Sequence, residues 1–286
     1  MPPAALCCDS TGRDPTSAPL PVTGRFAGRR ALVTGASRGI GAAVALQLAA
    51  DGADVAIVAR SVEPHEKIAG SLNETAELIR QRGARCIVIG ADLSHEDDRS
   101  RIVPEAMEGL GGVDILVNNA AAAIYQPPET YSLKHRRLSM EVNYHAPADL
   151  MQALVPHLIE AGEGWIVNLT SSAAGPTPGP PFTVGVQIGL YGATKAALNR
   201  LTNAMGASLY GTGVRVNAVM PRAAVLSEGA DILVGDLLRP DQMEPMESMV
   251  EAVLRLCECG PERTGQVYVS LDLLAEPFPL SPTVHQ

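Results

Sequence analysis

The sequence predicts an α/β protein in which helices cover both faces of a parallel sheet. A short apolar run, Ala31–Val33, leads into glycines at 35, 39 and 41 and then into an alanine-rich stretch of high helix propensity. Apolar runs recur along the chain, each separated from the next by a stretch of helical character. This alternation favours parallel strands, because a chain that returns through a helix re-enters the sheet in the same direction.

The expected elements follow this alternation along the chain. The strands are expected at 31–33, 55–59, 86–89, 115–117, 165–169, 214–219 and 266–269. The helices are expected from 42 to about 50, at 71–82, from 94 to about 110, through 129–160 and at 191–210. Ser94 is expected to cap its helix, and Pro147 and Pro156 to interrupt the region 129–160. Residues 1–24 are expected to form a loose tail and residues 25–286 a single domain.

Composition excludes several classes of function. The net charge of −9 argues against nucleic acid as a partner, because binding phosphates requires clustered Lys and Arg. No run approaches the 18 apolar residues of a membrane span, and the N-terminus has no apolar segment of signal-peptide length. The five cysteines, of which Cys257 and Cys259 are placed on a helix, are expected to be reduced thiols in a cytoplasmic protein without a metal site.

The segment T-G-A-S-R-G-I-G, residues 34–41, predicts a phosphate-binding turn. Glycines allow the backbone to turn tightly and to approach a ligand closely. The helix that follows directs its N–H groups and the positive end of its dipole at that ligand. Ligands of parallel sheets lie beyond the carboxyl ends of the strands. The residues expected at this edge are Gly35–Gly41, Arg60, Asp92, Asn119, Ser171 and Pro221.

Two arginines indicate which nicotinamide nucleotide would fit this edge. The strand at 55–59 is followed by Arg60, without the carboxylate that binds the ribose 2′-hydroxyl of NAD. Arg38, inside the glycine turn, adds a second guanidinium, and arginine can bind phosphate with two hydrogen bonds. We therefore expect NADP rather than NAD. The alternative is that both arginines simply face solvent.

Tyr191 and Lys195 are the candidate acid–base pair. They are four residues apart in Y-G-A-T-K and share one face of the expected helix. The lysine cation is expected to lower the pKa of the Tyr191 phenol below its usual value of about 10. A tyrosine adjusted in this way can exchange a proton with a carbonyl or alcohol oxygen near neutral pH, and Ser171 could hydrogen-bond the same oxygen.

Together these motifs resemble the short-chain dehydrogenase/reductase family over roughly residues 25–269. The resemblance is carried by T-G-A-S-R-G-I-G at 34–41, N-N-A at 118–120, Ser171 and Y-G-A-T-K at 191–195. It implies a single Rossmann-type sheet of about seven strands and a hydride transfer between NADP(H) and a secondary alcohol or ketone. Residues 59–67 and 217–222 are similar to the hydroxysteroid dehydrogenase-like 2 subgroup, a likeness that does not name a substrate.

The resemblance also implies roles for individual residues. Tyr191 would be the acid/base, Lys195 would hold the nicotinamide ribose, Ser171 would orient the substrate oxygen and Asn143 would support a proton relay through water. The implied cofactor-binding residues are Gly35, Ser37, Arg38, Gly39, Ile40, Gly41, Arg60, Asp92, Leu93, Asn119, Ala120, Tyr191, Lys195, Pro221 and Ala224. By analogy with the family, a homodimer or homotetramer is expected.

Several departures from the family pattern leave alternatives open. Arg222 follows Pro221 where glycine is usual, Ala121 follows N-N-A where glycine is also usual, and no Thr occurs near Leu226. A cofactor-binding scaffold or redox sensor without turnover, or a non-redox isomerase or dehydratase, therefore stands beside the oxidoreductase. The stretch 175–181 is either a lid or a surface loop. Spacing from Asn168 favours Ser171 over Ser172, and the apolar segment 223–250 suggests a lipophilic substrate.

Overall fold

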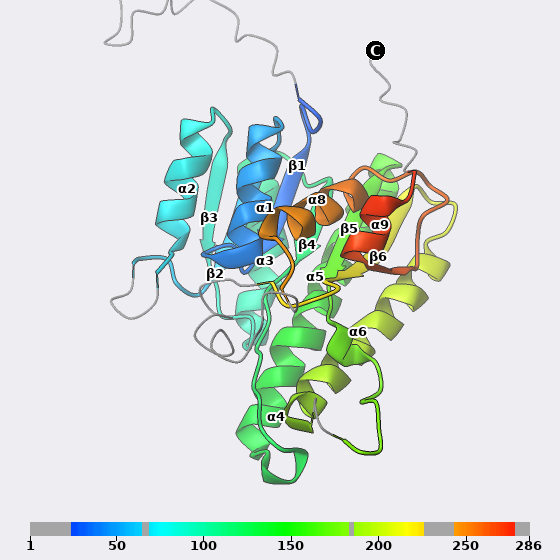
Figure 1. The fold of residues 1–286 in the computed structure, drawn as a ribbon. Helices are drawn as coiled ribbons and strands as arrows, with labels where there is room; N and C mark the ends of the chain where they lie inside the picture. Colours follow the sequence, from blue (N-terminus) through cyan, green and yellow to red (C-terminus); the bar gives the residue numbers. More distant parts are fainter. Residues whose placement is uncertain (1–23, 65–68, 183–185, 226–242, 278–286) are drawn as a thin grey trace, which may run out of the picture.

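The computed structural model describes residues 24–64, 69–182, 186–225 and 243–277. They form one sheet of seven strands with helices on both faces (Figure 1). Every neighbouring pair of strands is parallel, so the predicted doubly wound sheet of about seven strands is confirmed. The strands are β1 (Arg30–Thr34), β2 (Asp54–Ala59), β3 (Cys86–Gly90), β4 (Ile115–Asn118), β5 (Gly164–Leu169), β6 (Val214–Met220) and β7 (Val267–Val269).

The order of the strands places a ligand crevice beside β1. The sheet runs β3-β2-β1-β4-β5-β6-β7, so the chain moves outward in one direction from β1 and then crosses back to β4. Val33 of β1 pairs with Ile57 on one side and with Val117 on the other. In open parallel sheets ligands bind where the strand order reverses, beyond the carboxyl ends. Here that point lies between the ends of β1 and β4.

The helices are divided between the two faces of the sheet. α1, α2 and α8 pack on one face, and α3, α5 and α6 on the other. Their bounds are α1 (Gly39–Ala50), α2 (Leu72–Gln81), α3 (Glu96–Leu110), α4 (Leu133–Met140), α5 (Ala146–Ala161), α6 (Gly189–Ser208), α8 (Met246–Leu256) and α9 (Ser270–Ala275). No helix within these described stretches combines the length and the apolar character that crossing a bilayer requires.

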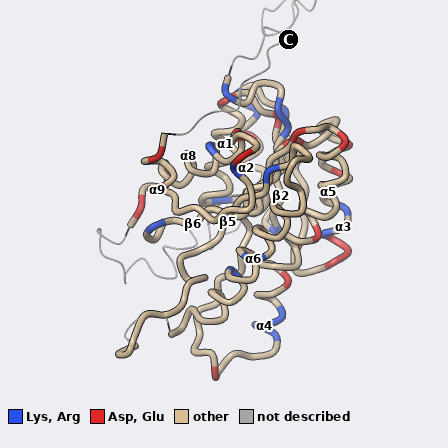
Figure 2. The backbone as a smooth tube through the Cα atoms, turned by 90° about the vertical axis from the view of Figure 1, so that its right-hand side faces the viewer, with Lys and Arg blue, Asp and Glu red and all other residues tan. Residues whose placement is uncertain are grey.

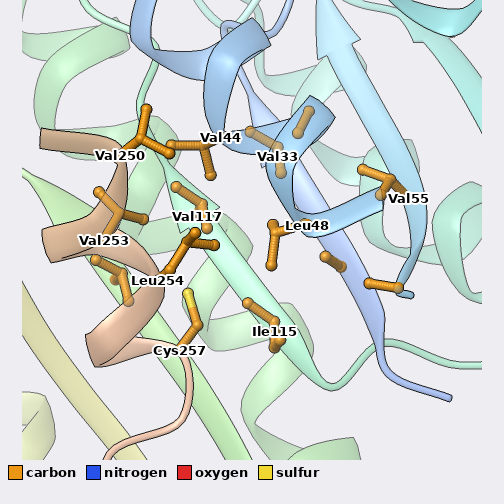
Figure 3. Packing of buried hydrophobic residues seen from close by; sticks show 14 of the residues in the cluster. Val33, Val44, Leu48, Val55, Ile115, Val117, Val250, Val253, Leu254 and Cys257 are labelled. Atoms are coloured by element: carbon orange, nitrogen blue, oxygen red, sulfur yellow. The ribbon is translucent and has the colours of Figure 1, made fainter. Parts of the chain in front are cut away.

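Alternation along each strand divides the core into two layers. Val33 and Val117 face α1 and α8, whereas their neighbours Leu32 and Leu116 face α3 and α5. Figure 3 shows Val33 and Val117 packed against Val44 and Val250. Both faces are therefore apolar, as expected for strands covered on both sides. Figure 2 shows most charged residues in the outer elements, around a largely uncharged sheet.

Two expectations about helix ends are wrong. Ser94 does not cap α3, because its hydroxyl donates to Asp92 at 2.7 Å and the N-cap residue is His95. Cys257 is the C-cap of α8 and Cys259 lies beyond it, so the two thiols do not share a helix. Helix α8 ends earlier than the sequence suggested, and both cysteines are buried in the protein.

The predicted break near residues 129–160 exists but has a different cause. Pro147 and Pro156 both lie inside α5, and the interruption is a π turn, Glu141–His145, that joins α4 to α5. Pro147 occupies the first turn of α5, where its missing N–H is tolerated. The same missing N–H leaves the carbonyl of Asn143, four residues earlier, without its α-helical donor. Of the expected N-terminal tail, all but Gly24 lies outside the described residues.

Candidate active site

The glycine turn after β1 is held in place by Asn119, the residue that follows β4. The Asn119 side-chain amide donates to the carbonyls of Thr34 and Gly35 at 2.9 and 3.2 Å. A Cβ on Gly35 would lie 2.7 Å from that amide, and a Cβ on Gly41 would clash with the amide and the Gly35 carbonyl. Only glycine fits at these two positions, so the backbone of the turn stays open to a ligand.

The turn leads directly into α1, which begins at Gly39. Gly35 and Gly39 have φ values of +68° and +57°, a region that glycine adopts without strain. Arg38, the N-cap residue, makes no side-chain hydrogen bond to the helix. The positive end of the α1 dipole is therefore directed at the crevice between β1 and β4, which suits a phosphate.

A cavity of about 280 Å³ lies beside the turn, and it collects the residues predicted for the adenosine end of the cofactor. The predicted residues on its wall are Gly35, Ser37, Arg38, Arg60, Asp92, Leu93, Asn119 and Ala120. Burial by itself raises the pKa of Asp92, but two hydrogen bonds from Ser94 and the charge of Arg60 reverse this and hold that pKa below its usual range. Asp92 is therefore a carboxylate at neutral pH.

The two arginines of this cavity differ in what they already bind. The Arg38 guanidinium donates to the carbonyls of Ala69 and Gly70, both at 2.8 Å, so the protein fixes its orientation. Arg60 is exposed and lies on the wall of this cavity and of the larger one next to it. Both arginines therefore line the smaller cavity, and the guanidinium of Arg38 is already hydrogen-bonded to the protein.

The larger cavity, of about 740 Å³, brings together the predicted catalytic side chains. Ser171 follows β5, whereas Tyr191 and Lys195 lie on the first turns of α6. The predicted cofactor residues Ile40, Pro221 and Ala224 line the same space. The sequence therefore identified three side chains from two distant segments that meet at one edge of the sheet.

Ser171, and not Ser172, contacts the candidate acid–base tyrosine. The Ser171 side chain lies close enough to the Tyr191 phenol to lower its pKa, and the Ser171 hydroxyl accepts a hydrogen bond from the Ala173 N–H at 3.2 Å. Ser172 is exposed. Both serines line the larger cavity, and Ser171 stays the predicted catalytic serine.

The expected effect of Lys195 on Tyr191 is wrong in this structure. Burial raises the pKa of the Tyr191 phenol, with a further rise from Tyr125 and a partial decrease from the Ser171 hydrogen bond. The Lys195 ammonium lies 5.8 Å from the centre of the Tyr191 ring and donates to the Leu169 carbonyl at 2.7 Å. Burial lowers the pKa of Lys195 itself to about 8. Desolvation thus outweighs the attraction between the two groups.

Comparison with known proteins agrees with this geometry. The family model described as short chain dehydrogenase matches residues 29–229. The chain belongs to this family. Hydroxysteroid dehydrogenase-like protein 2 of Bos taurus is 31% identical over 261 residues, which cover 90% of this chain and 60% of that protein. The human protein of the same name is 30% identical with the same coverage, so the chain spans about 60% of the length of these relatives.

Solved structures of short-chain dehydrogenases share the fold. One from Burkholderia cenocepacia in complex with NADP is 33% identical, has a TM-score of 0.74 and aligns over 86% of this chain and 97% of its own. A putative gluconate 5-dehydrogenase from Beutenbergia cavernae, with NADP bound at low occupancy, is 28% identical, has a TM-score of 0.75 and covers 90% and 100% of the two chains.

Asn143 acts differently from the other predicted residues of the dehydrogenase site, because its side chain lies behind the cavity wall. The side-chain oxygen Oδ1 accepts a hydrogen bond from the Ala122 N–H at 2.7 Å. The side-chain nitrogen Nδ2 donates to the Ala122 carbonyl and to the Thr194 hydroxyl, both at 3.0 Å. Asn143 is fully buried. The side chain therefore holds the wall and the start of α6 together.

Tyr125 is a cavity residue that the sequence did not reveal. Its ring meets the Tyr191 ring edge-on, with centroids 6.0 Å apart and an interplanar angle of 75°. It also lies on the wall of the larger cavity. A single aromatic residue in the loop after β4 carries no motif, so only the folded chain shows that it touches Tyr191.

Of the departures from the family pattern, Ala121 lines both cavities and Arg222 is directed to the surface. The Arg222 guanidinium pairs with Asp272 of α9, away from the cavity, and the Arg222 backbone N–H donates to Glu244 at 2.8 Å. The neighbours Pro221 and Ala224 still line it. The region around Leu226 lies outside the described residues.

In the long segment before α6, residues 175–182 are exposed. Phe182 is 60% exposed, and the Gln187 carbonyl accepts the Gln126 N–H at 2.9 Å. Ile188, just after that contact, lines the larger cavity. The segment is therefore joined to the loop that carries Tyr125 at one point and exposed at another.

Proposed function

We propose that this dehydrogenase transfers a hydride between NADP(H) and a lipophilic secondary alcohol or ketone. The observation that carries the proposal is that Ser171, Tyr191 and Lys195 line one cavity together with the predicted cofactor residues Ile40, Pro221 and Ala224. When bound, the nicotinamide supplies or accepts the hydride. The side chains of the protein position the substrate oxygen and move the proton.

The residues at the two cavities suit the parts of a dinucleotide. Gly35, Gly39 and Gly41 would hold the pyrophosphate, because a side chain at 35 or 41 would close the turn. Asp92 and Leu93 would flank the adenine, and Lys195 would bind the nicotinamide ribose. Arg38 and Arg60 support NADP, since two guanidiniums at one cavity favour a 2′-phosphate.

Reduction of a ketone needs one hydride at carbon and one proton at oxygen. The Tyr191 hydroxyl would give that proton to the substrate oxygen, and the Ser171 hydroxyl would donate a hydrogen bond to the same atom. The raised pKa of Tyr191 keeps the phenol protonated before the reaction, which suits the donor. Lys195 and the backbone carbonyl of Asn143 would return a proton to Tyr191 from solvent.

The wall of the larger cavity supports an apolar substrate. Among its described lining residues, only Arg60 and Lys195 carry a charge, and both are assigned to the cofactor. The apolar side chains on this wall include Ile124, Leu138, Ile188, Val225 and Met249. A carbon skeleton without ionised groups would bury apolar area there at no cost of charge desolvation.

Titration of the protein with NADPH and NADH tests the cofactor. We expect NADPH to bind more tightly, and Arg60→Ala to weaken NADPH about 10- to 100-fold, as for loss of one charged hydrogen bond, while NADH is unaffected. Arg85→Ala is the control, because Arg85 pairs with Asp54 at the opposite edge of the sheet. Tighter NADH binding, together with unchanged NADPH binding by Arg60→Ala, would disprove the assignment.

Turnover separates hydride transfer from the alternatives. On a panel of apolar ketones and secondary alcohols, we expect a change in NADPH absorbance that follows product formation. Tight cofactor binding without absorbance change on any compound would favour a scaffold, and product without net cofactor change an isomerase or dehydratase. The Arg222 side chain, which motivated the scaffold, does not reach the cavity.

We also propose a cytoplasmic homodimer or homotetramer. Cys86, Cys257 and Cys259 are free and buried, which supports a reducing compartment. Light scattering of the purified protein measures the oligomeric state, and a monomer at micromolar concentration would contradict this part of the proposal.

A further inference from the structure

Arg99 is a buried arginine of α3 that the proposed reaction does not use. It is 6% exposed. One terminal nitrogen donates to the Leu93 carbonyl at 3.0 Å and to Glu141 at 2.8 Å, and Nε donates to Asp149 at 2.6 Å. One guanidinium thus connects the loop after β3, the π turn and α5.

The partners of Arg99 belong to two parts of the site. Leu93 is on the wall of the smaller cavity, next to Asp92. Glu141 begins the π turn, two residues before Asn143. Asn143 in turn holds Ala122, which lines both cavities, and Thr194, which precedes Lys195. A displacement at Arg99 would therefore reach the start of α6 and the wall of the smaller cavity at Asp92 and Leu93, which we call the adenine wall.

The chemistry of this contact requires an arginine. A buried cation is tolerated only when it is paired, and here two carboxylates that are themselves 35% and 40% exposed pair with it. The rigid fork of a guanidinium can serve three acceptors in fixed directions, which the single ammonium of a lysine cannot reproduce. Without the guanidinium, the Leu93 carbonyl loses a donor, and Glu141 and Asp149 remain as like charges beside the π turn.

We propose that Arg99 is a positioning residue that fixes the adenine wall and the Asn143 turn relative to each other. Cofactor affinity and proton transfer both depend on this arrangement. The inference rests on the proposed function, because it assigns the smaller cavity to adenine and the π turn to the proton path. It does not depend on the identity of the substrate.

The test compares Arg99→Met and Arg99→Lys with Arg215→Met. Arg215 is equally buried, donates to the Gly213 carbonyl at 2.7 Å and lies 3.7 Å from Glu163, but it is at the opposite edge of the sheet. We expect Arg99→Met to raise the Kd for NADPH and to lower kcat, each by at least about tenfold, because a small displacement of a reacting group has this effect. Arg99→Lys should be intermediate, and Arg215→Met should lower stability while leaving Kd and kcat within about twofold.

A triple variant separates positioning from stability. Arg99→Met combined with Glu141→Gln and Asp149→Asn removes the uncompensated charges, so we expect it to regain stability to urea but not NADPH affinity. Recovery of wild-type Kd and kcat by the triple variant, or their retention in Arg99→Met, would overturn the proposal. The affinity measurement needs no turnover, so it is distinct from a failure of the panel of ketones and alcohols. If Arg99→Met does not fold, Arg99→Lys and the triple variant give the same comparison.

Discussion

At the amino-terminal edge of the sheet, Asp54 and Asp114 are bound by arginines, whereas at the carboxyl-terminal edge Arg38, Arg60 and Asp92 line the smaller cavity. Asp114 accepts hydrogen bonds from the Arg30 backbone N–H and from its guanidinium, at 2.7 to 2.9 Å. Asp54 pairs with Arg85 in the same manner, at 2.9 Å. Each of these carboxylates is held by three hydrogen bonds from one arginine, so we assign their contribution to stability.

Trp165 completes the contrast at the amino-terminal edge. Its ring lies under the guanidiniums of Arg29 and Arg215, at 4.6 and 4.9 Å, and Glu163 pairs with both arginines. At the other edge, Arg60 is exposed beside two cavities. One sheet therefore carries a stabilising edge and a binding edge, and the two should respond to mutation independently.

Tyr191→Phe should produce the largest effect and confine it to the binding edge. We expect kcat to fall about 100- to 10,000-fold, the usual contribution of general acid–base catalysis, with stability changed by less than about 1 kcal/mol. Tyr210→Phe is the matched control, because Tyr210 is 70% exposed at the stabilising edge. Full turnover by Tyr191→Phe would show that the proton comes from another group.

Burial of Lys195 should lower the free energy of unfolding by an amount that depends on pH. Its folded pKa, about 8, lies below the unfolded value of about 10.4. Between these pH values the unfolded chain retains a proton that the folded chain has released, so the free energy of unfolding should rise with pH, by up to about 3 kcal/mol.

Urea unfolding of wild type and Lys195→Met at pH 7.5 and pH 10 measures this difference. The raised pKa values of buried thiols and phenols act in the opposite direction, but they are common to both chains and cancel. Lys195→Met should lack the part of the pH dependence that the lysine adds. Identical pH profiles for the two chains would mean that Lys195 is not desolvated as its burial indicates.

Local patterns predicted the fold and the positions of most cavity residues. The glycine turn, the strand-end residues and Tyr191 with Lys195 are short-range signals, because strand direction and helix period fix where they lie. The patterns could not predict how far burial shifts the pKa of a side chain. The proximity of Lys195 suggested a lowered pKa for Tyr191, but desolvation depends on every segment packed around the phenol.

The residues that sequence reasoning missed act through contacts between distant segments. Arg99 meets Glu141 and Asp149, 42 and 50 positions away, and Tyr125 meets Tyr191. Neither belongs to a motif with a fixed spacing. Arg38 shows the reverse case, since its charge was predicted but its hydrogen bonds to Ala69 and Gly70 were not.

Asp114→Asn should damage only the stabilising edge. Asp114 is buried, and the substitution removes the charged partner of Arg30, so we expect a loss of about 2–3 kcal/mol in the free energy of unfolding. The Kd for NADPH should stay within about twofold, because the two cavities that hold the predicted cofactor residues lie at the other edge. Asp97→Asn is the control, since Asp97 is exposed on α3 and should cost less than about 1 kcal/mol. A parallel loss of NADPH affinity in Asp114→Asn would show that the two edges are coupled.

Arg222→Ala should have the smallest effect, although Arg222 follows a strand at the binding edge. Its side chain pairs with Asp272 at the surface, and exposed ion pairs contribute about 0–1 kcal/mol. We therefore expect kcat, the Kd for NADPH and stability all to stay close to wild type in assays run beside Arg60→Ala. A loss of affinity as large as that of Arg60→Ala would mean that Arg222 reaches the cofactor. Position at the carboxyl end of a strand would then decide whether a side chain binds the cofactor, even when that side chain is already paired within the protein.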